Sequence, residues 1–132
     1  MASTNTTKMS QDIISDALNK LMNAKRAGKN SITVSYHSKL LSSVLAVAKL
    51  KGYIKSYKVE QGKMTIEIGK LNFCRAIKPR YAVTVAEIEN YEKRYLPAKN
   101  FGTIIVSTSE GLMTHQTAQE KNRGGSLMAY FY

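Results

Sequence analysis

The chain has 132 residues, of which 43% are hydrophobic, a length that suits one ordinary domain or two small ones. Twenty lysines and arginines stand against nine aspartates and glutamates, so the formal net charge is +11 at pH 7. The single cysteine excludes an internal disulfide and an all-cysteine zinc site, and no apolar run reaches the roughly 18 residues that a membrane-spanning helix needs. We therefore expect a small basic protein of a reducing compartment, with a polyanionic partner and no membrane.

The first half of the chain predicts one α/β domain over residues 10–70. Residues 1–9 are rich in Ser, Thr and Asn, so we expect a disordered or extended tail there rather than a secretory signal. The predicted elements that follow are a helix from Ser10 to Gly28, a strand over residues 31–35, a helix from Ser38 to Gly52, and a hairpin over residues 54–59 and 64–68 around Gln61-Gly62. Two helices covering one face of a small antiparallel sheet would bury every apolar stripe.

The second half is richer in strands and predicts a β-rich domain over residues 71–132. The expected elements are strands over residues 73–77 and 81–85 around Lys78-Pro79-Arg80, a helix over 87–94, a strand over 103–106, a helix from Thr114 to about Asn122, and a last strand over 127–132 after Gly124-Gly125. The fold class is thus α+β, with two small domains that meet near Lys70. Because each half is too small to bury a large core, we expect the halves to depend on each other.

The positive charges are segregated along the chain. No acidic residue lies between Asp16 and Glu60, a stretch with nine lysines and arginines, and a second acid-free stretch separates Glu67 from Glu87. Clustered cations neutralise phosphates and release their counterions, so this pattern favours a nucleic-acid partner. The alternative is that the lysines only solvate helix surfaces.

Enzyme motifs are missing from the sequence. The histidines, His37 and His115, lie far apart, and no CxxC, HExxH, Walker-type or GxGxxG pattern occurs. Ser109 and Glu110 with His115 lack the nucleophile elbow of a triad, and the clustered glutamates after residue 86 suggest a solvated helix face. We expect no catalytic residue, no metal, no cofactor and no small-molecule substrate.

The segment Ser107-Thr108-Ser109-Glu110-Gly111 places three hydroxyl side chains between a buried strand and a glycine. Hydroxyl and N–H groups can bond to phosphates, to 2′-hydroxyls and to the edges of unpaired bases, although such residues also form ordinary turns. Gly124-Gly125 likewise has two interpretations: a turn with positive φ, or a flat surface that lies against a ligand. Tyr130 and Tyr132 are either a base-stacking platform or packing residues.

The run from Tyr91 to Tyr132 resembles the C-terminal part of the ribosomal protein S8 family, in its archaeal and eukaryotic-like form. The STSEG segment, the GLMTH helix start, the GG pair and the closing AYFY stand at the spacing of that family. The segments Ile77–Tyr81, Ser38–Leu40 and Lys51–Ile54 match as well. The resemblance extends over nearly the whole chain from about Ser10.

This resemblance implies a two-domain protein of the small ribosomal subunit, cytoplasmic within the ribosome. It implies binding to the central domain of 16S-type ribosomal RNA (rRNA) early in assembly, beside neighbouring small-subunit ribosomal proteins. By position, Ser107, Thr108 and Ser109 would contact an exposed base in the minor groove of an irregular RNA helix. The other residues that the resemblance places on RNA are Glu110 and Gly111, which shape the loop, Gly124 and Gly125 against the backbone, and Lys25, Arg26, Lys29, Ser38 and Lys39 in the first domain.

Five further residues complete the candidate RNA-contacting set: Lys78, Arg80 and Tyr81, where charge and an aromatic ring interleave, and Thr114 and His115 at the helix start. Glu110 departs from the family, in which many members have a basic or amide residue there. We expect its carboxylate to point away from phosphate or to meet a base amino group. Two alternative functions remain: a free regulatory RNA-binding protein, such as a translational repressor, using the same surface, and an RNA-processing enzyme.

Overall fold

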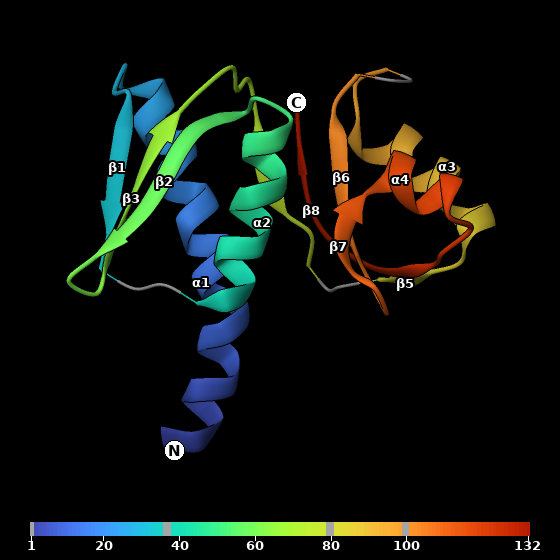
Figure 1. Ribbon diagram of the computed structural model, residues 1–132, viewed down its shortest axis with the longest axis horizontal. Coiled ribbons are helices and arrows are strands. Elements are labelled where there is room, and N and C mark those ends of the chain that lie inside the picture. Colours follow the sequence, from blue (N-terminus) through green and yellow to red (C-terminus); the bar gives the residue numbers. More distant parts are fainter. Residues whose placement is uncertain (1, 36–37, 79–80, 99–100) are drawn as a thin grey trace. The chain divides into compact units, whose positions relative to one another are not determined.

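The computed structural model describes residues 2–35, 38–78, 81–98 and 101–132, and the side chains from Ile13 onward within those ranges (Figure 1). Four helices and antiparallel strands make up these residues, so the predicted α+β class is confirmed. The chain divides into two compact units, Met1–Leu71 and Asn72–Tyr132, next to Lys70, where the composition changes.

The first unit has the predicted order of helix, strand, helix, strand, strand. Its elements are α1 (Ala2–Arg26), β1 (Ser31–Val34), α2 (Lys39–Leu50), β2 (Ile54–Glu60) and β3 (Lys63–Ile68). The sheet order is β1-β3-β2 with both pairs antiparallel. Figure 1 shows α1 and α2 on the same face of this sheet, as their apolar stripes require.

Helix α1 begins earlier than the sequence predicts. The helix runs from Ala2, whereas we expected a disordered or extended tail up to residue 9 and a start at Ser10. Residues 2–9 contain neither glycine nor proline, so their Ser, Thr and Asn residues weaken the helix without ending it. The buried stripe of Ile14, Ala17, Leu18 and Leu21 fixes the following turns, and a helix that is already nucleated extends at low cost.

Helix α2 and the β2–β3 hairpin follow their sequence signals closely. The Ser38 hydroxyl accepts a hydrogen bond from the Leu41 N–H at 3.0 Å, which confirms Ser38 as an N-cap. The hairpin turn is Gln61-Gly62, in which both residues have positive φ (51° and 77°), as a two-residue turn between twisted strands requires.

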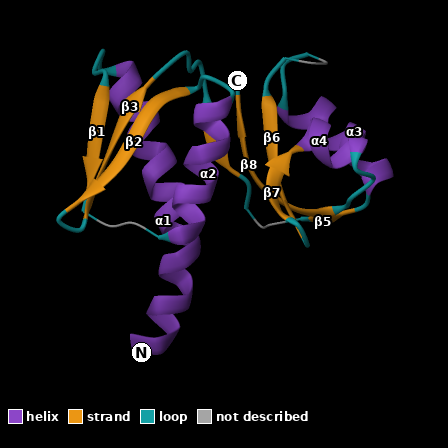
Figure 2. Cartoon of the chain, in the orientation of Figure 1, coloured by secondary structure: helices purple, strands orange, loops and turns teal. Residues whose placement is uncertain are grey.

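The second unit is a five-stranded antiparallel sheet with two helices. Its elements are β4 (Cys74–Ala76), β5 (Ala82–Val83), α3 (Val85–Tyr95), β6 (Thr103–Thr108), β7 (Gly111–Thr114), α4 (His115–Glu120) and β8 (Gly125–Phe131). The strand order is β4-β8-β6-β7, and β5 also pairs with β8. Figure 2 shows α3 and α4 on the same side of this sheet. Between the helices and the sheet lies a core that includes Ile88, Ile104, Val106, Ala118 and Leu127.

Several elements of the second unit differ from the prediction. Strand β6 continues to Thr108, and β7 has no counterpart among the predicted strands. The turn between them is Ser109-Glu110, which lacks the Asn-Gly or Asp-Gly signature of a hairpin. Helix α3 begins at Val85, two residues early, because the Glu87 carboxylate accepts hydrogen bonds from the N–H and the hydroxyl of its N-cap, Thr84.

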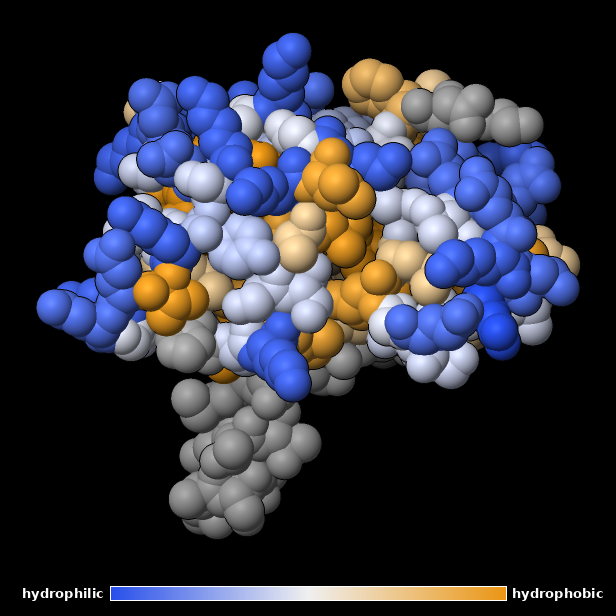
Figure 3. Space-filling model, in the orientation of Figure 1, coloured by the Kyte–Doolittle hydropathy of each residue, from blue (hydrophilic) through white to orange (hydrophobic). Residues whose placement is uncertain are grey.

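The surface is strongly polar. On the face drawn in Figure 3, hydrophilic side chains cover large areas of both units, with hydrophobic patches interspersed. All nine lysines and arginines of the acid-free stretch from residue 17 to residue 59 are exposed. No helix within the described part of the chain is long and apolar enough to cross a membrane.

Candidate nucleic-acid interface

The hydroxyl-rich segment is the tip of the β6–β7 hairpin rather than a loop after a strand. Ser107 and Thr108 are the last residues of β6, Ser109 and Glu110 form the turn, and Gly111 begins β7. Ser107 is paired on both sides, with Leu112 of β7 and with Ser126 of β8. The strand register therefore fixes the backbone of the first two hydroxyl residues.

The three hydroxyls have different roles. The Thr108 hydroxyl donates to the Gly111 carbonyl at 2.9 Å and accepts from the Glu110 N–H at 3.1 Å. It therefore holds the turn, and its one donor is used. The hydroxyls of Ser107 and Ser109 make no hydrogen bond to another described residue. Ser109 is exposed and Ser107 half-buried, so these two can serve a ligand while Thr108 positions them.

Gly124 and Gly125 bring the start of β8 against two other strands. A Cβ on Gly124 would lie 2.5 Å from the Val83 carbonyl oxygen, and one on Gly125 would overlap the Ser107 carbonyl oxygen. Neither glycine has positive φ, so the predicted positive-φ turn is wrong; Asn122 carries the positive φ instead, at 56°. The absence of side chains here allows a close backbone approach that sets Gly125 beside Ser107.

Glu110 is held by an arginine that the sequence analysis missed. Arg123 Nε lies 2.9 Å from Glu110 Oε2, and both side chains are about half exposed. The contact with Arg123 compensates the carboxylate charge within the protein. A guanidinium has five N–H donors, so Arg123 keeps donors for a phosphate while it binds Glu110. The sequence feature that indicates Arg123 as a candidate is its position immediately before Gly124-Gly125, which are themselves candidate contact residues.

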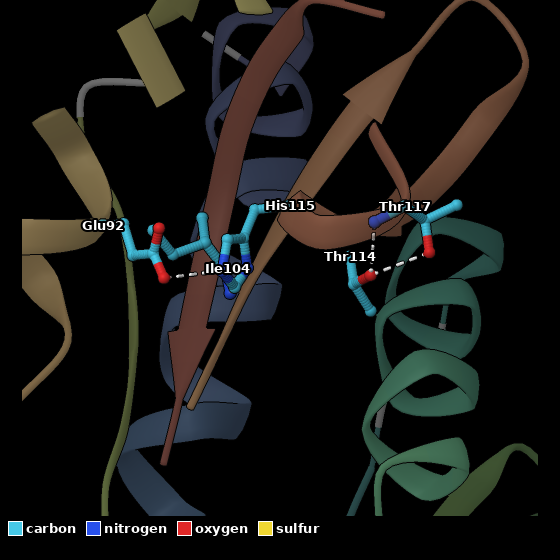
Figure 4. Close-up of polar contacts among 5 residues, drawn as sticks. All are labelled: Glu92, Ile104, Thr114, His115 and Thr117. Atoms are coloured by element: carbon cyan, nitrogen blue, oxygen red, sulfur yellow. Dashed lines mark hydrogen bonds and ion pairs between the residues drawn. The ribbon is translucent and has the colours of Figure 1, made fainter. Parts of the chain in front are cut away.

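Two predicted contact residues belong to the core instead. Thr114 is 5% exposed and caps α4, with its hydroxyl accepting from the Thr117 N–H at 3.1 Å (Figure 4). His115 is completely buried, and its Nδ1 accepts from the Ile104 N–H at 3.1 Å. Its Nε2 lies 3.5 Å from Oε2 of the buried Glu92, as Figure 4 shows. Because Nδ1 is an acceptor, Nε2 carries the proton and faces the carboxylate. Neither side chain reaches the surface, so the expected RNA contacts of Thr114 and His115 are wrong.

The remaining candidates belong to segments of the sequence outside the β6–β7 hairpin. Lys25 and Arg26 are in the last turn of α1, and with Lys29 and Lys39 they form an exposed basic set in the first unit. The Ser38 hydroxyl is occupied by its capping bond to Leu41. Of the others, Lys78 is exposed, Tyr81 is half-buried, and Arg80 and His37 lie outside the described residues.

The described residues give little support to other site chemistry. Among them, no group of three or more His, Cys, Asp or Glu side chains is placed to hold a metal ion. Burial raises the pKa of the Cys74 thiol to about 12, so the thiol is protonated and inert at neutral pH.

Comparison with known proteins places the chain in a family. The profile of the family described as "Ribosomal protein S8" matches residues 12–132. The chain belongs to the ribosomal protein S8 family. The resemblance seen in the STSEG, GLMTH and AYFY segments is thereby confirmed. Members of the S8 family are ribosomal structural proteins rather than enzymes.

Two archaeal relatives of the S8 family match over most of their length, and both are named "Small ribosomal subunit protein uS8". The protein of Methanococcoides burtonii is 46% identical over 126 residues, which cover 92% of this chain and 97% of the relative. The protein of Archaeoglobus fulgidus is 43% identical over 129 residues, which cover 94% of this chain and all of the relative. These matches agree with the archaeal form indicated by the sequence.

Proposed function

We propose that this protein is a structural constituent of the small ribosomal subunit that binds the central domain of 16S-type rRNA and helps to assemble the subunit. The observation that carries the proposal is a surface that we call the hydroxyl edge, formed by Ser107, Thr108, Ser109, Arg123, Gly124 and Gly125. Its members come from the end of β6, from the β6–β7 turn and from the segment that leads into β8, and backbone pairing and the Arg123–Glu110 contact hold them together. The names of the relatives support the same assignment.

The hydroxyl edge suits the minor groove of an irregular RNA helix. The minor groove of A-form RNA is wide and shallow and presents 2′-hydroxyls and base edges, whereas its major groove is too narrow for side chains. The Ser107 and Ser109 hydroxyls can both donate and accept hydrogen bonds, and the missing side chains of Gly124 and Gly125 let the start of β8 pack against Val83 and Ser107. Arg123 supplies a cation at the same edge for a flanking phosphate.

The exposed cations of the first unit supply affinity rather than sequence recognition. Lys25, Arg26, Lys29 and Lys39 would neutralise phosphates and displace counterions, a contribution that weakens steeply with added salt. The two units thus divide the work: the first provides salt-sensitive attraction, and the second chooses the position on the RNA.

Binding measurements on two RNAs test this proposal. The probes are an irregular stem from the central domain of small-subunit rRNA and a regular duplex of equal length. We expect the double variant Ser107→Ala/Ser109→Ala to bind the irregular stem about tenfold more weakly, roughly the value of one or two hydrogen bonds, and the duplex unchanged. Ser43→Ala is the matched control, since its hydroxyl donates to the Lys39 carbonyl in the other unit. Equal weakening on both RNAs, or on neither, would contradict the proposal.

Sedimentation distinguishes a subunit component from a free regulator. A structural constituent should travel with small subunits in a low-salt gradient of cell extract. A translational repressor that uses the same surface would remain mainly in the light fractions with its messenger RNA. Footprinting on isolated small-subunit rRNA then locates the site, and we expect one compact protected patch in the central domain.

A further inference from the structure

A continuous chain of aromatic rings crosses the second unit, and we call it the aromatic row. Successive ring centroids along it are 5.0 to 6.4 Å apart. Its members, in spatial order, are Tyr81, Tyr91, Tyr95, Tyr130 and Tyr132, and the last of these contacts both Phe73 and Phe101. The hydroxyl edge contains none of these residues, so it does not explain the row.

The position of the row follows from strand register and helix spacing. In β8, Tyr130 lies opposite Ile104 of β6 and Arg75 of β4. Tyr91 and Tyr95 stand one turn apart on α3, and Tyr95 meets Tyr130 with ring centroids 5.0 Å apart. The row therefore lies where α3 passes over β8, and it lines the margin of the helix-side core.

The rings of the row remain partly open to solvent. All five tyrosines are only half-buried although they pack against the core, and Phe101 is 49% exposed. In an aromatic cluster that only stabilises the fold, we would expect the rings to be fully buried, because burial of each ring removes a large apolar area from water. Seven adjoining rings that are partly exposed are instead typical of a surface that binds another molecule.

Cations rather than carboxylates accompany the rings. The Arg94 guanidinium lies 5.7 Å from the Tyr81 ring centroid and 5.5 Å from that of Tyr95, within cation–π range. It is exposed and has no carboxylate partner among the described residues. Arg75 is exposed opposite Tyr130. The glutamates Glu87 and Glu92 of α3 are directed elsewhere, toward Thr84 and His115.

The hydroxyls of Tyr95 and Tyr130 add no negative charge at neutral pH. Burial is the main cause that raises the pKa of Tyr95 and of Tyr130, so both stay protonated. The row therefore combines flat faces, neutral hydroxyls and exposed guanidinium groups. Unpaired RNA supplies the matching chemistry, since its bases stack on aromatic rings and its phosphates pair with arginine. An acidic peptide would match the charge but would offer few flat faces.

We propose that the aromatic row, with Arg94 and Arg75, binds unpaired nucleotides of RNA at a site separate from the hydroxyl edge. Tyr130 is five residues along β8 from Gly125, roughly 15 Å at the usual rise of a strand. This inference adds a second contact to the RNA-binding function proposed above, and a different class of RNA tests it.

Tyrosine fluorescence reports stacking directly, because the chain has eight tyrosines and no tryptophan. The probes, at one ionic strength, are single-stranded decaadenylate, inorganic polyphosphate of the same charge and a glutamate decapeptide. The test variants are Tyr91→Leu/Tyr95→Leu and, as a change that leaves the rings in place, Arg94→Gln. Tyr57→Leu is the control, since Tyr57 is a half-buried tyrosine of β2 in the other unit.

We expect decaadenylate to quench the fluorescence of the wild type and of Tyr57→Leu and to bind about tenfold more weakly to both row variants. Polyphosphate and the peptide should bind with nearly the same affinity to all four proteins, because they have no bases to stack on the rings. The Ser107→Ala/Ser109→Ala variant should bind decaadenylate normally, so a failure of the hydroxyl edge and a failure of the row are distinguishable.

Three results would overturn the inference. They are unchanged decaadenylate binding by Arg94→Gln, polyphosphate binding that falls as much as decaadenylate binding in the row variants, and a peptide that binds tightly to the wild type but not to the row variants. The last result would make the row an acidic-protein site. Circular dichroism identifies any row variant that is unfolded, and Arg94→Gln then decides the outcome.

Discussion

Arg123 and Glu110 join the two segments that form the hydroxyl edge, with Nε and Oε2 2.9 Å apart. One residue is in the β6–β7 turn and the other directly precedes Gly124-Gly125. A half-exposed pair of this kind contributes little to stability, about 0 to 1 kcal/mol. Its main effect is therefore on geometry and local charge, since it compensates the one carboxylate in a surface that would meet RNA.

The substitution Glu110→Gln distinguishes the effect of the Arg123–Glu110 contact on stability from its effect on RNA binding. We expect a loss of stability of less than about 1 kcal/mol in urea denaturation. Binding to a regular duplex at low salt should become severalfold tighter because a negative charge is removed, whereas binding to the irregular stem should gain less. Glu120→Gln, at an exposed glutamate of α4, changes the net charge equally. If both variants alter the two affinities in the same ratio, the Arg123–Glu110 contact does not affect recognition.

Thr108 should act through its hydroxyl alone. Thr108→Ala removes both the donor to the Gly111 carbonyl and the acceptor for the Glu110 N–H. We expect about 1 kcal/mol of lost stability and about tenfold weaker binding to the irregular stem, because the turn is no longer fixed. Thr108→Ser keeps both bonds and should restore stability and binding. Isothermal calorimetry measures the binding, and a Thr108→Ser variant as weak as Thr108→Ala would contradict this role.

His115 should matter for stability and not for RNA recognition. Replacing it by alanine opens a cavity, removes the acceptor of the Ile104 N–H and removes the imidazole beside the buried Glu92, so we expect a loss of about 3 to 5 kcal/mol. Chemical denaturation measures the loss. The protein that remains folded at low temperature should still bind the irregular stem with wild-type affinity. A large drop in that affinity would return His115 to the interface.

The hydrogen bonds of Glu87 predict that the fold loses part of its stability at acid pH. Hydrogen bonds from the Thr84 N–H and hydroxyl hold the pKa of Glu87 below its ordinary value of 4.5. A carboxyl whose pKa is lowered by folding stabilises the fold above its unfolded-state pKa, and the contribution disappears as the pH falls through the folded-state pKa. Between pH 5 and about pH 3, Glu87→Gln should therefore lose less stability than the wild type. Thermal melts over this range check it, and the exposed Glu89→Gln should follow the wild-type curve.

Lys25 and Arg26 should set salt dependence. For Lys25→Ala/Arg26→Ala we expect weaker binding to both the irregular stem and the regular duplex. The slope of log affinity against log salt should become shallower by about 1 to 2, one unit for roughly each lost phosphate contact. Lys63→Ala/Lys70→Ala removes two exposed lysines of the same unit that are not among the predicted contacts. A slope that is unchanged, or that changes equally in the control, would exclude phosphate contact by Lys25 and Arg26.

Local signals made much of the fold predictable. Ser38, Gly28 and Gly52 mark helix ends through interactions within a few residues, and Gln61-Gly62 needs only its own backbone conformation. These features depend on atoms that are close in the sequence, so the local sequence predicts them. Strand β7 was missed because its pairing with β6 does not rely on a turn residue of a usual type.

The candidate site was less predictable because its key contacts are long-range. Arg123 and Glu110 are separated by β7 and α4, and no local pattern indicates that they meet. The burial of His115 depends on Ile104 and Glu92, which come from other elements. Without knowledge of those partners, the sequence predicts that a polar residue at a helix start is exposed.

The glycine at position 125 has a consequence for how the last strand joins the sheet. Only a residue without a side chain fits against the Ser107 carbonyl, and both neighbours of the Gly124-Gly125 pair, Arg123 and Ser126, carry one. A slip of β8 that brought either neighbour to this point would drive a Cβ into the backbone of β6. Steric exclusion therefore disfavours these two alignments of the final strand during folding, before any RNA is present.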